Sequence, residues 1–112
     1  MGSGKILRVG GVESLDSLVC AMCADYERRQ TAIDERSATR RTDMEYRYLN
    51  FHILDAASEI AGERYGIIYV NEIGRRIGYA SSLVDHLSEG AYKLEKQRIK
   101  ENIARKLHLL DI

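Results

Sequence analysis

The sequence predicts an all-α fold. Apolar residues recur at helical intervals of three and four in three long stretches, the chain contains no proline, and its one strand-like run, Ile67–Val70, has no partner strand nearby. A length of 112 residues, 45% of them hydrophobic, suits one domain with a single modest core. We therefore expect one helical domain over residues 1–112.

The charge balance limits the classes of function. The chain has 17 basic and 17 acidic residues and a formal net charge of zero, so it is not an overall basic nucleic-acid binder, and any such role must come from a local patch. It has no apolar run near the roughly 18 residues that a membrane span needs, and no apolar signal region follows the N-terminus. We expect a cytoplasmic protein without a membrane partner.

The first part of the chain predicts an arm and a helical hairpin over residues 14–61. Residues 1–13 form the arm, in which Lys5–Val9 is extended and could pack on the surface or on a neighbouring subunit. Ser14 is the expected N-cap of a helix to about residue 35. One face of this helix carries a heptad-like seam that suits intramolecular packing or a dimer interface, with intramolecular packing favoured: Leu15, Val19, Met22, Tyr26, Arg29 and Ile33.

A polar loop over 34–42 should lead to a central second helix over 43–61, capped by Thr42 or Asp43 and ended by Gly62. This helix has two apolar stripes, so it should contact more than one neighbour. The first stripe is Tyr46, Leu49, Ile53, Ala56 and Ile60, and the second is Met44, Tyr48 and Phe51. We read Ile67–Val70 as the entry to a short third helix over 69–77, led by Asn71 and Glu72. A linker over 79–87 follows, with a possible helical turn at 83–86.

The last stretch predicts a long helix over 88–109, with Ser88 as its N-cap. Its apolar stripe is Tyr92, Ile99, Ile103, Leu107 and Leu110. At about 100° per residue, Lys93, Gln97 and Lys100 share a second, basic face, and Lys96 lies on its border. Leu94, Arg98, Glu101 and Arg105 make a third side with possible ion pairs. A charged face of this kind is also typical of simple solvation.

The remaining reactive residues give no catalytic constellation. Cys20 and Cys23 form a lone C-x-x-C without a second pair of metal ligands, so we expect buried, reduced thiols rather than a redox or zinc site. We find no nucleophile, base and acid at a catalytic spacing and no phosphate-binding glycine loop. The sequence therefore predicts a protein that is not an enzyme and needs no cofactor.

The segments Val70–Gly78 and Leu87–Lys93 resemble a helix-turn-helix half, as in sigma-factor region-four-like regulators of the phage autolysin-regulator type. The resemblance covers about the last 45 residues, and its motif Ser-x-x-x-Tyr-x-x-x-Lys corresponds to Ser88, Tyr92 and Lys96. It implies a helix-turn-helix-like half over 67–112, although nine residues separate Gly78 from Ser88, where three or four are usual.

The resemblance also implies roles on DNA. Ser88, Lys93, Gln97 and Lys100 would face the major groove, and Lys96 at the border of this face would also contact DNA. Gln97 would lie on a base edge and the lysines mainly on phosphates, while Arg75 and Arg76 would hold the backbone. The first hypothesis is thus a small, dimeric transcriptional regulator of phage or mobile-element type that binds double-stranded DNA. The alternative is a helical protein-interaction module, either a homo-oligomeric adaptor or a phage-encoded inhibitor of a host protein.

Overall fold

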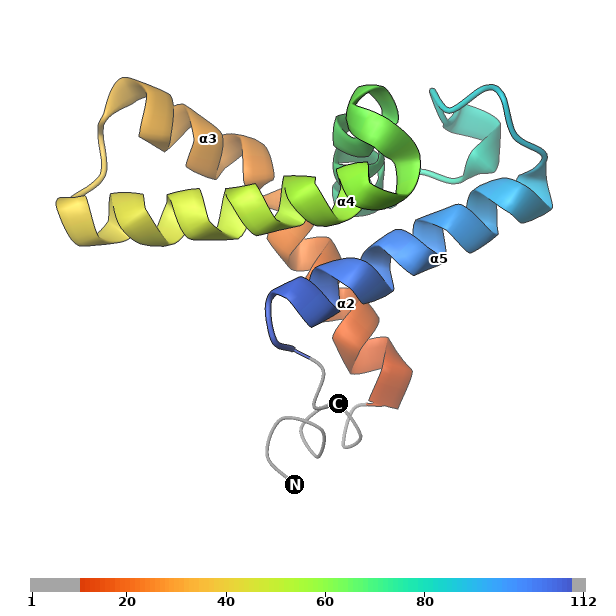
Figure 1. Ribbon diagram of the computed structural model, residues 1–112, viewed down its shortest axis with the longest axis horizontal. Coiled ribbons are helices and arrows are strands. Elements are labelled where there is room, and N and C mark those ends of the chain that lie inside the picture. The colour runs from red at the N-terminus through yellow and green to blue at the C-terminus, as the bar shows by residue number, and fades with distance from the viewer. Residues whose placement is uncertain (1–10, 110–112) are drawn as a thin grey trace.

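The computed structural model describes the backbone of residues 11–109 and the side chains from Leu15 onward. Within this range all the regular secondary structure is helical, which confirms the all-α prediction (Figure 1). The elements are α2 (Gly11–Ala24), α3 (Tyr26–Glu35), α4 (Arg40–Arg75), the 3₁₀ turn η1 (Tyr79–Ser81) and α5 (Glu89–Lys106). The expected arm at Lys5–Val9 and the expected core residue Leu110 lie outside the described residues.

The single helix expected over 14–35 is wrong, because the chain breaks at Asp25 into α2 and α3. Asp25 has φ −90° and ψ 0°, and the two helices leave it in different directions (Figure 1). The first helix also begins at Gly11, so Ser14 lies inside it and is not an N-cap. The seam predicted across this stretch is used within the chain, since Val19, Tyr26 and Ile33 are all buried.

Arg29, the one charged member of that seam, joins α3 to the end of α2 and to α4. Its Nε donates to Oδ1 of Asn50 at 2.8 Å, and its Nη2 donates to the carbonyl of Met22 at 2.6 Å. The Asn50 amide in turn donates to the carbonyl of Tyr26 at 3.1 Å. Because the break at Asp25 interrupts the regular helical hydrogen bonds, these side chains satisfy carbonyls on both sides of it.

The connection between α3 and α4 is shorter than the predicted loop over 34–42. Helix α3 ends at Arg36 in the left-handed conformation, and α4 begins at Arg40 rather than at residue 43. The N-cap is Thr39, whose side chain accepts a hydrogen bond from the Thr42 backbone nitrogen at 3.3 Å. After this turn, the first half of α4 runs back beside α3 (Figure 1).

Helix α4 consists of two helical segments that meet at Gly62. This glycine has φ +86° and ψ 164°, values that L-residues rarely adopt, and the chain changes direction there (Figure 1). The predicted end of the second helix at Gly62 is confirmed. The next helical segment begins directly after it, however, so Ile67–Val70 lies inside a helix rather than at the entry of one starting at 69.

The core lies where α2 and α5 pack against α4. Its fully buried side chains include Ile53, Ile73, Ile99 and Ile103, while the predicted core residues Tyr46 and Leu49 are only half-buried. Helix α2 approaches the second segment of α4 so closely that a Cβ on Gly74 would lie 2.7 Å from the backbone nitrogen of Ala24. This contact places the C-terminal end of α2 against the C-terminal part of α4, and α2 also packs against α5.

Candidate nucleic-acid interface

Helix α5 begins as the sequence predicts. The Ser88 side chain accepts a hydrogen bond from the Ala91 backbone nitrogen at 3.2 Å, which confirms it as the N-cap, and Glu89 lies in the first turn. Gly90 and Ala91 are exposed, and no atom lies within 4 Å of a Cβ placed on Gly90. The first turn of α5 is therefore open to solvent at Gly90 and Ala91, beside the exposed Glu89. The helix ends at Lys106, three residues before the predicted end.

The start of α5 is attached to α4 by one buried carboxylate. Glu72 is 2% exposed and accepts three hydrogen bonds: from Oγ of Ser82 at 2.7 Å, from the Leu83 backbone nitrogen at 2.6 Å and from Oη of Tyr92 at 2.9 Å. These donors come from the connecting segment and from α5. The expectation that Glu72 leads the third helix is wrong, because the residue lies in the middle of a helical segment and is buried.

Two tyrosines extend this attachment along α5. The rings of Tyr69 and Tyr92 stack with centroids 5.6 Å apart, and Tyr69 Oη donates to Glu95 at 2.8 Å. Burial raises the pKa of both phenols, and the hydrogen bond to Glu95 adds to the rise for Tyr69. The orientation of α5 against α4 is thus defined by packed rings together with hydrogen bonds.

Two of the predicted DNA-binding lysines make contacts inside the molecule. Lys100 Nζ lies 2.8 Å from Oδ1 of Asp16 on α2, and its side chain is 19% exposed. Lys96 donates to the carbonyl of Ile77 at 2.5 Å and lies over the Tyr92 ring. Burial lowers the pKa of Lys96. Both ammonium groups therefore hold α5 against its neighbours.

The other predicted residues of α5 face solvent. Lys93 forms an exposed ion pair with Glu89 at 2.9 Å, and Gln97 donates to Glu101 at 3.4 Å along the exposed side. These contacts link neighbouring turns of one helix and are weak in water. With their exposed neighbours they define the outer face of α5, which consists of Gly90, Ala91, Lys93, Leu94, Gln97, Arg98, Glu101 and Arg105.

Arg75 and Arg76 lie at the C-terminal end of α4. Both are exposed, and Arg76 has the left-handed conformation of a helix C-cap, with φ 56° and ψ 40°. The next residue, Ile77, supplies the carbonyl that Lys96 and Tyr92 contact. The chain segment that carries both arginines is therefore attached to the N-terminal half of α5. This attachment fixes the position of the two arginines relative to that helix.

The two thiols are buried and form no disulfide, which confirms the prediction from the sequence. Cys20 and Cys23 are buried and free, and burial raises the pKa of the Cys23 thiol to about 12. The described part of the chain holds no group of three or more His, Cys, Asp and Glu side chains arranged for a metal ion. None of the helices between residues 11 and 109 is long and apolar enough to cross a membrane.

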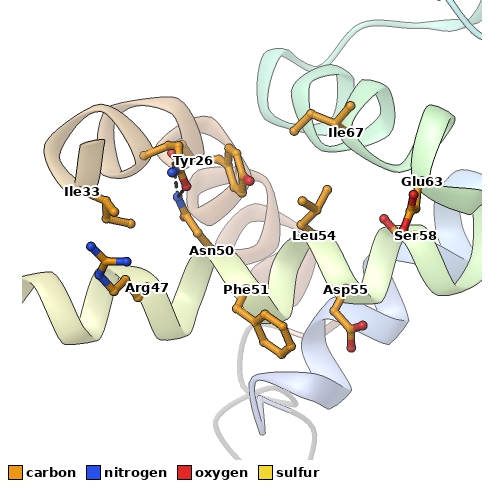
Figure 2. Close-up of a pocket in the computed structure, with 11 residues that line it drawn as sticks. Tyr26, Ile33, Arg47, Asn50, Phe51, Leu54, Asp55, Ser58, Glu63 and Ile67 are labelled. Atoms are coloured by element: carbon orange, nitrogen blue, oxygen red, sulfur yellow. Dashed lines mark hydrogen bonds between the residues drawn. The ribbon is translucent and has the colours of Figure 1, made fainter. Parts of the chain in front are cut away.

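A second surface lies on the first segment of α4. The predicted second stripe of this helix, Met44, Tyr48 and Phe51, is exposed rather than covered. Beside it, α3 and both segments of α4 border an open groove of about 710 Å³. In Figure 2, Leu54 points toward Ile67 across this groove, and Phe51, which also lines the groove, points in the opposite direction. The stripe thus follows one edge of a groove that both apolar and polar side chains line.

Comparison of the chain with protein-family models, with curated proteins and with solved structures finds no match. The assignment of function therefore depends on the geometry of the two surfaces described above.

Proposed function

We propose that the protein binds double-stranded DNA and that the outer face of α5 enters the major groove, as a small transcriptional regulator of phage or mobile-element type. The observation that carries the proposal is the open first turn of α5, where Ser88 caps the helix and Gly90 and Ala91 leave space around the backbone. A helix N-terminus free of bulky side chains can approach a phosphate closely, and exposed polar side chains one and two turns later can reach base edges.

The exposed charges support this orientation of α5. Lys93 projects from the first half of α5 and Arg98 from its middle, and Arg75 and Arg76 lie on the segment attached to it. We assign phosphate contacts to these four side chains and a base contact to Gln97. Lys96 and Lys100, whose ammonium groups are held by Ile77 and Asp16, take a supporting role in this proposal.

A titration of fluorescent duplex DNA at several salt concentrations tests the proposal. Lys93→Ala and Arg76→Ala should weaken binding to every sequence and lower the slope of log affinity against log salt by roughly one for each phosphate that the variant no longer neutralises. Gln97→Ala should reduce sequence preference at one base pair, by about 1–3 kcal/mol.

Arg36→Asn is the matched control for these variants. It removes one exposed positive charge from the α3–α4 connection, and asparagine tolerates the left-handed conformation found there. The control should bind like the unmodified chain. The proposal fails if the unmodified protein does not bind duplex DNA at low salt, or if Lys93→Ala and Arg76→Ala bind as the control does.

A second candidate function is that of a helical protein-interaction module. The observation that favours it is the apolar stripe on α4, where Met44, Tyr48 and Phe51 are 63%, 47% and 64% exposed. Large apolar side chains that lie together on one exposed helix face are typical of interaction sites. In the titration above, this candidate predicts no DNA binding. It also predicts that Phe51→Glu, unlike Leu83→Glu at another exposed apolar position, abolishes association with a protein partner.

A further inference from the structure

The exposed stripe on α4 has the spacing of a helix–helix interface. Arg41, Met44, Tyr48, Phe51 and Asp55 follow one another at intervals of three, four, three and four residues, which places them on one side of the helix. The apolar part is pre-arranged, because His52 packs edge-on against both Tyr48 and Phe51, with ring centroids 4.4 and 5.2 Å away. The stripe therefore presents an ordered aromatic surface with a charged residue at each end.

We propose that this stripe binds the same stripe of a second copy of the chain, with the two α4 helices antiparallel. An antiparallel pair that crosses between Tyr48 and Phe51 brings Tyr48 of each copy against Phe51 of the other. It is an isologous contact, in which one patch serves both partners and the assembly closes as a dimer. This inference does not depend on DNA binding by α5.

The distribution of charge along the first segment of α4 selects the antiparallel orientation. Its N-terminal part carries Arg40, Arg41 and Arg47 together with the acids Asp43 and Glu45, and its C-terminal part carries Asp55 and Glu59. Lys106 lies near Asp55 and Glu59, at 3.4 and 2.6 Å, and neutralises one of these negative charges. Three basic and two acidic residues leave the N-terminal part with one positive charge, and two acidic residues with Lys106 leave the C-terminal part with one negative charge.

In the antiparallel pair, the arginines of each copy lie beside the acidic end of the other, whereas a parallel pair would bring like charges together. Arg41 is free to make this contact, because its side chain is 92% exposed and its only contact with an acid among the described residues is a 3.7 Å pair with Glu45. The helix dipoles also favour the antiparallel orientation.

The size of the surface sets the strength of the dimer. The first segment of α4, residues 40–61, is about 33 Å long at 1.5 Å per residue, and the apolar part covers only its central turns. With three large apolar side chains at its centre, we expect this surface to bury less than the roughly 800 Å² per partner of stable complexes. We therefore expect a reversible dimer that forms at tens to hundreds of micromolar, weaker than the standard-sized complexes.

Sedimentation of the full chain over a range of concentrations from about 10 to 500 µM, which spans that expected affinity, tests the proposal. The mass should rise from 12.7 kDa toward twice that value as the concentration increases. Phe51→Glu and Met44→Glu should each weaken the dimer at least tenfold. The matched control is Leu83→Glu, since Leu83 is 72% exposed and lies far along the chain from the stripe. It should dimerise normally.

A charge reversal then tests the orientation. Arg41→Glu should weaken an antiparallel dimer several-fold, because it places an acid beside the acidic end of the second copy, whereas it would strengthen a parallel one. Leu83→Glu, which places an acid at an exposed position far along the chain from the stripe, is the control and should have no effect. Circular dichroism melts show whether each variant is folded.

Three results would overturn the proposal. The first is a monomer at every concentration. The second is a dimer that Leu83→Glu disrupts and Phe51→Glu does not. The third is an Arg41→Glu variant that dimerises more tightly.

Discussion

Replacing Glu72 with alanine removes the acceptor that attaches the 76–88 connection and the start of α5 to α4. The carboxylate is almost fully buried and accepts hydrogen bonds from Ser82, Leu83 and Tyr92 at 2.6–2.9 Å. A hydrogen bond to a charged group contributes about 1.5–3 kcal/mol, and the cost of burying the charge offsets part of the sum. Water can reach the Ser82 and Leu83 donors, but Tyr92 is buried. We therefore expect Glu72→Ala to lower the free energy of unfolding by about 3 kcal/mol.

Urea unfolding followed by circular dichroism measures this loss. Glu72→Gln is the matched control: its carbonyl can still accept from Tyr92 and Ser82, but its amide group cannot accept from the Leu83 backbone nitrogen. It should lose about half as much stability as Glu72→Ala, because two of the three hydrogen bonds remain while the third is replaced by two donors that face each other. Hydrogen exchange should also be faster over residues 79–92 in the alanine variant. A loss below about 0.5 kcal/mol for Glu72→Ala, the size of an ordinary surface substitution, would refute this account of how α5 is held.

Three other perturbations test the fold. Ile53→Ala should cost about 2–5 kcal/mol in the same urea experiment, since Ile53 is fully buried at the centre of α4, and an unchanged midpoint would contradict its place in the core. Gly62→Ala should cost about 1–3 kcal/mol, because alanine is strained at φ +86°; Gly90→Ala, at an open helical position, should not destabilise. Burial raises the pKa of Cys23 from 9.0 to about 12, so the unfolded thiol ionises first and stability should fall as the pH rises from 9.0 to about 12. Cys23→Ala should show a smaller fall, and an equal fall would contradict the assignment.

The helices could be predicted because their signals are local. Apolar residues at helical spacing predicted helix over most of the residues that form α2, α3, α4 and α5. Ser88 and Gly62 were recognised from the chemistry of a hydroxyl cap and of a residue without a Cβ. The break at Asp25 could not be predicted in this way, because Asp25 is compatible with a helix. The break is stabilised by Arg29, which donates to the carbonyl of Met22 seven residues earlier, and by Asn50, which donates to the carbonyl of Tyr26 from another helix, 24 residues away in the sequence.

The candidate site was less predictable, because the roles of its charged residues depend on tertiary contacts. Periodicity placed Lys93, Gln97 and Lys100 on one face of a helix, but it could not show that α2 would bring Asp16 to Lys100. Glu72 had the appearance of an exposed acid near a helix start. The one feature of the sequence that pointed to its burial is that it directly precedes Ile73, which is a core residue. This feature is insufficient, because the neighbour of a core residue on a helix can be either buried or exposed.

The outer face of α5 and the α4 stripe differ in composition, so a different observation is needed to show that each one binds a partner. The outer face of α5 is polar, and polar faces of helices are stable in water without any partner, so its significance depends on whether DNA binds there. The α4 stripe is apolar, and exposing Met44, Tyr48 and Phe51 is unfavourable in every conformation that leaves them uncovered. A surface that remains exposed at that cost, with opposite charges at its two ends, is better explained by a partner in solution than by the packing of this domain. Self-association is therefore the first property to measure, because a dimer would also determine how two α5 helices are spaced on DNA.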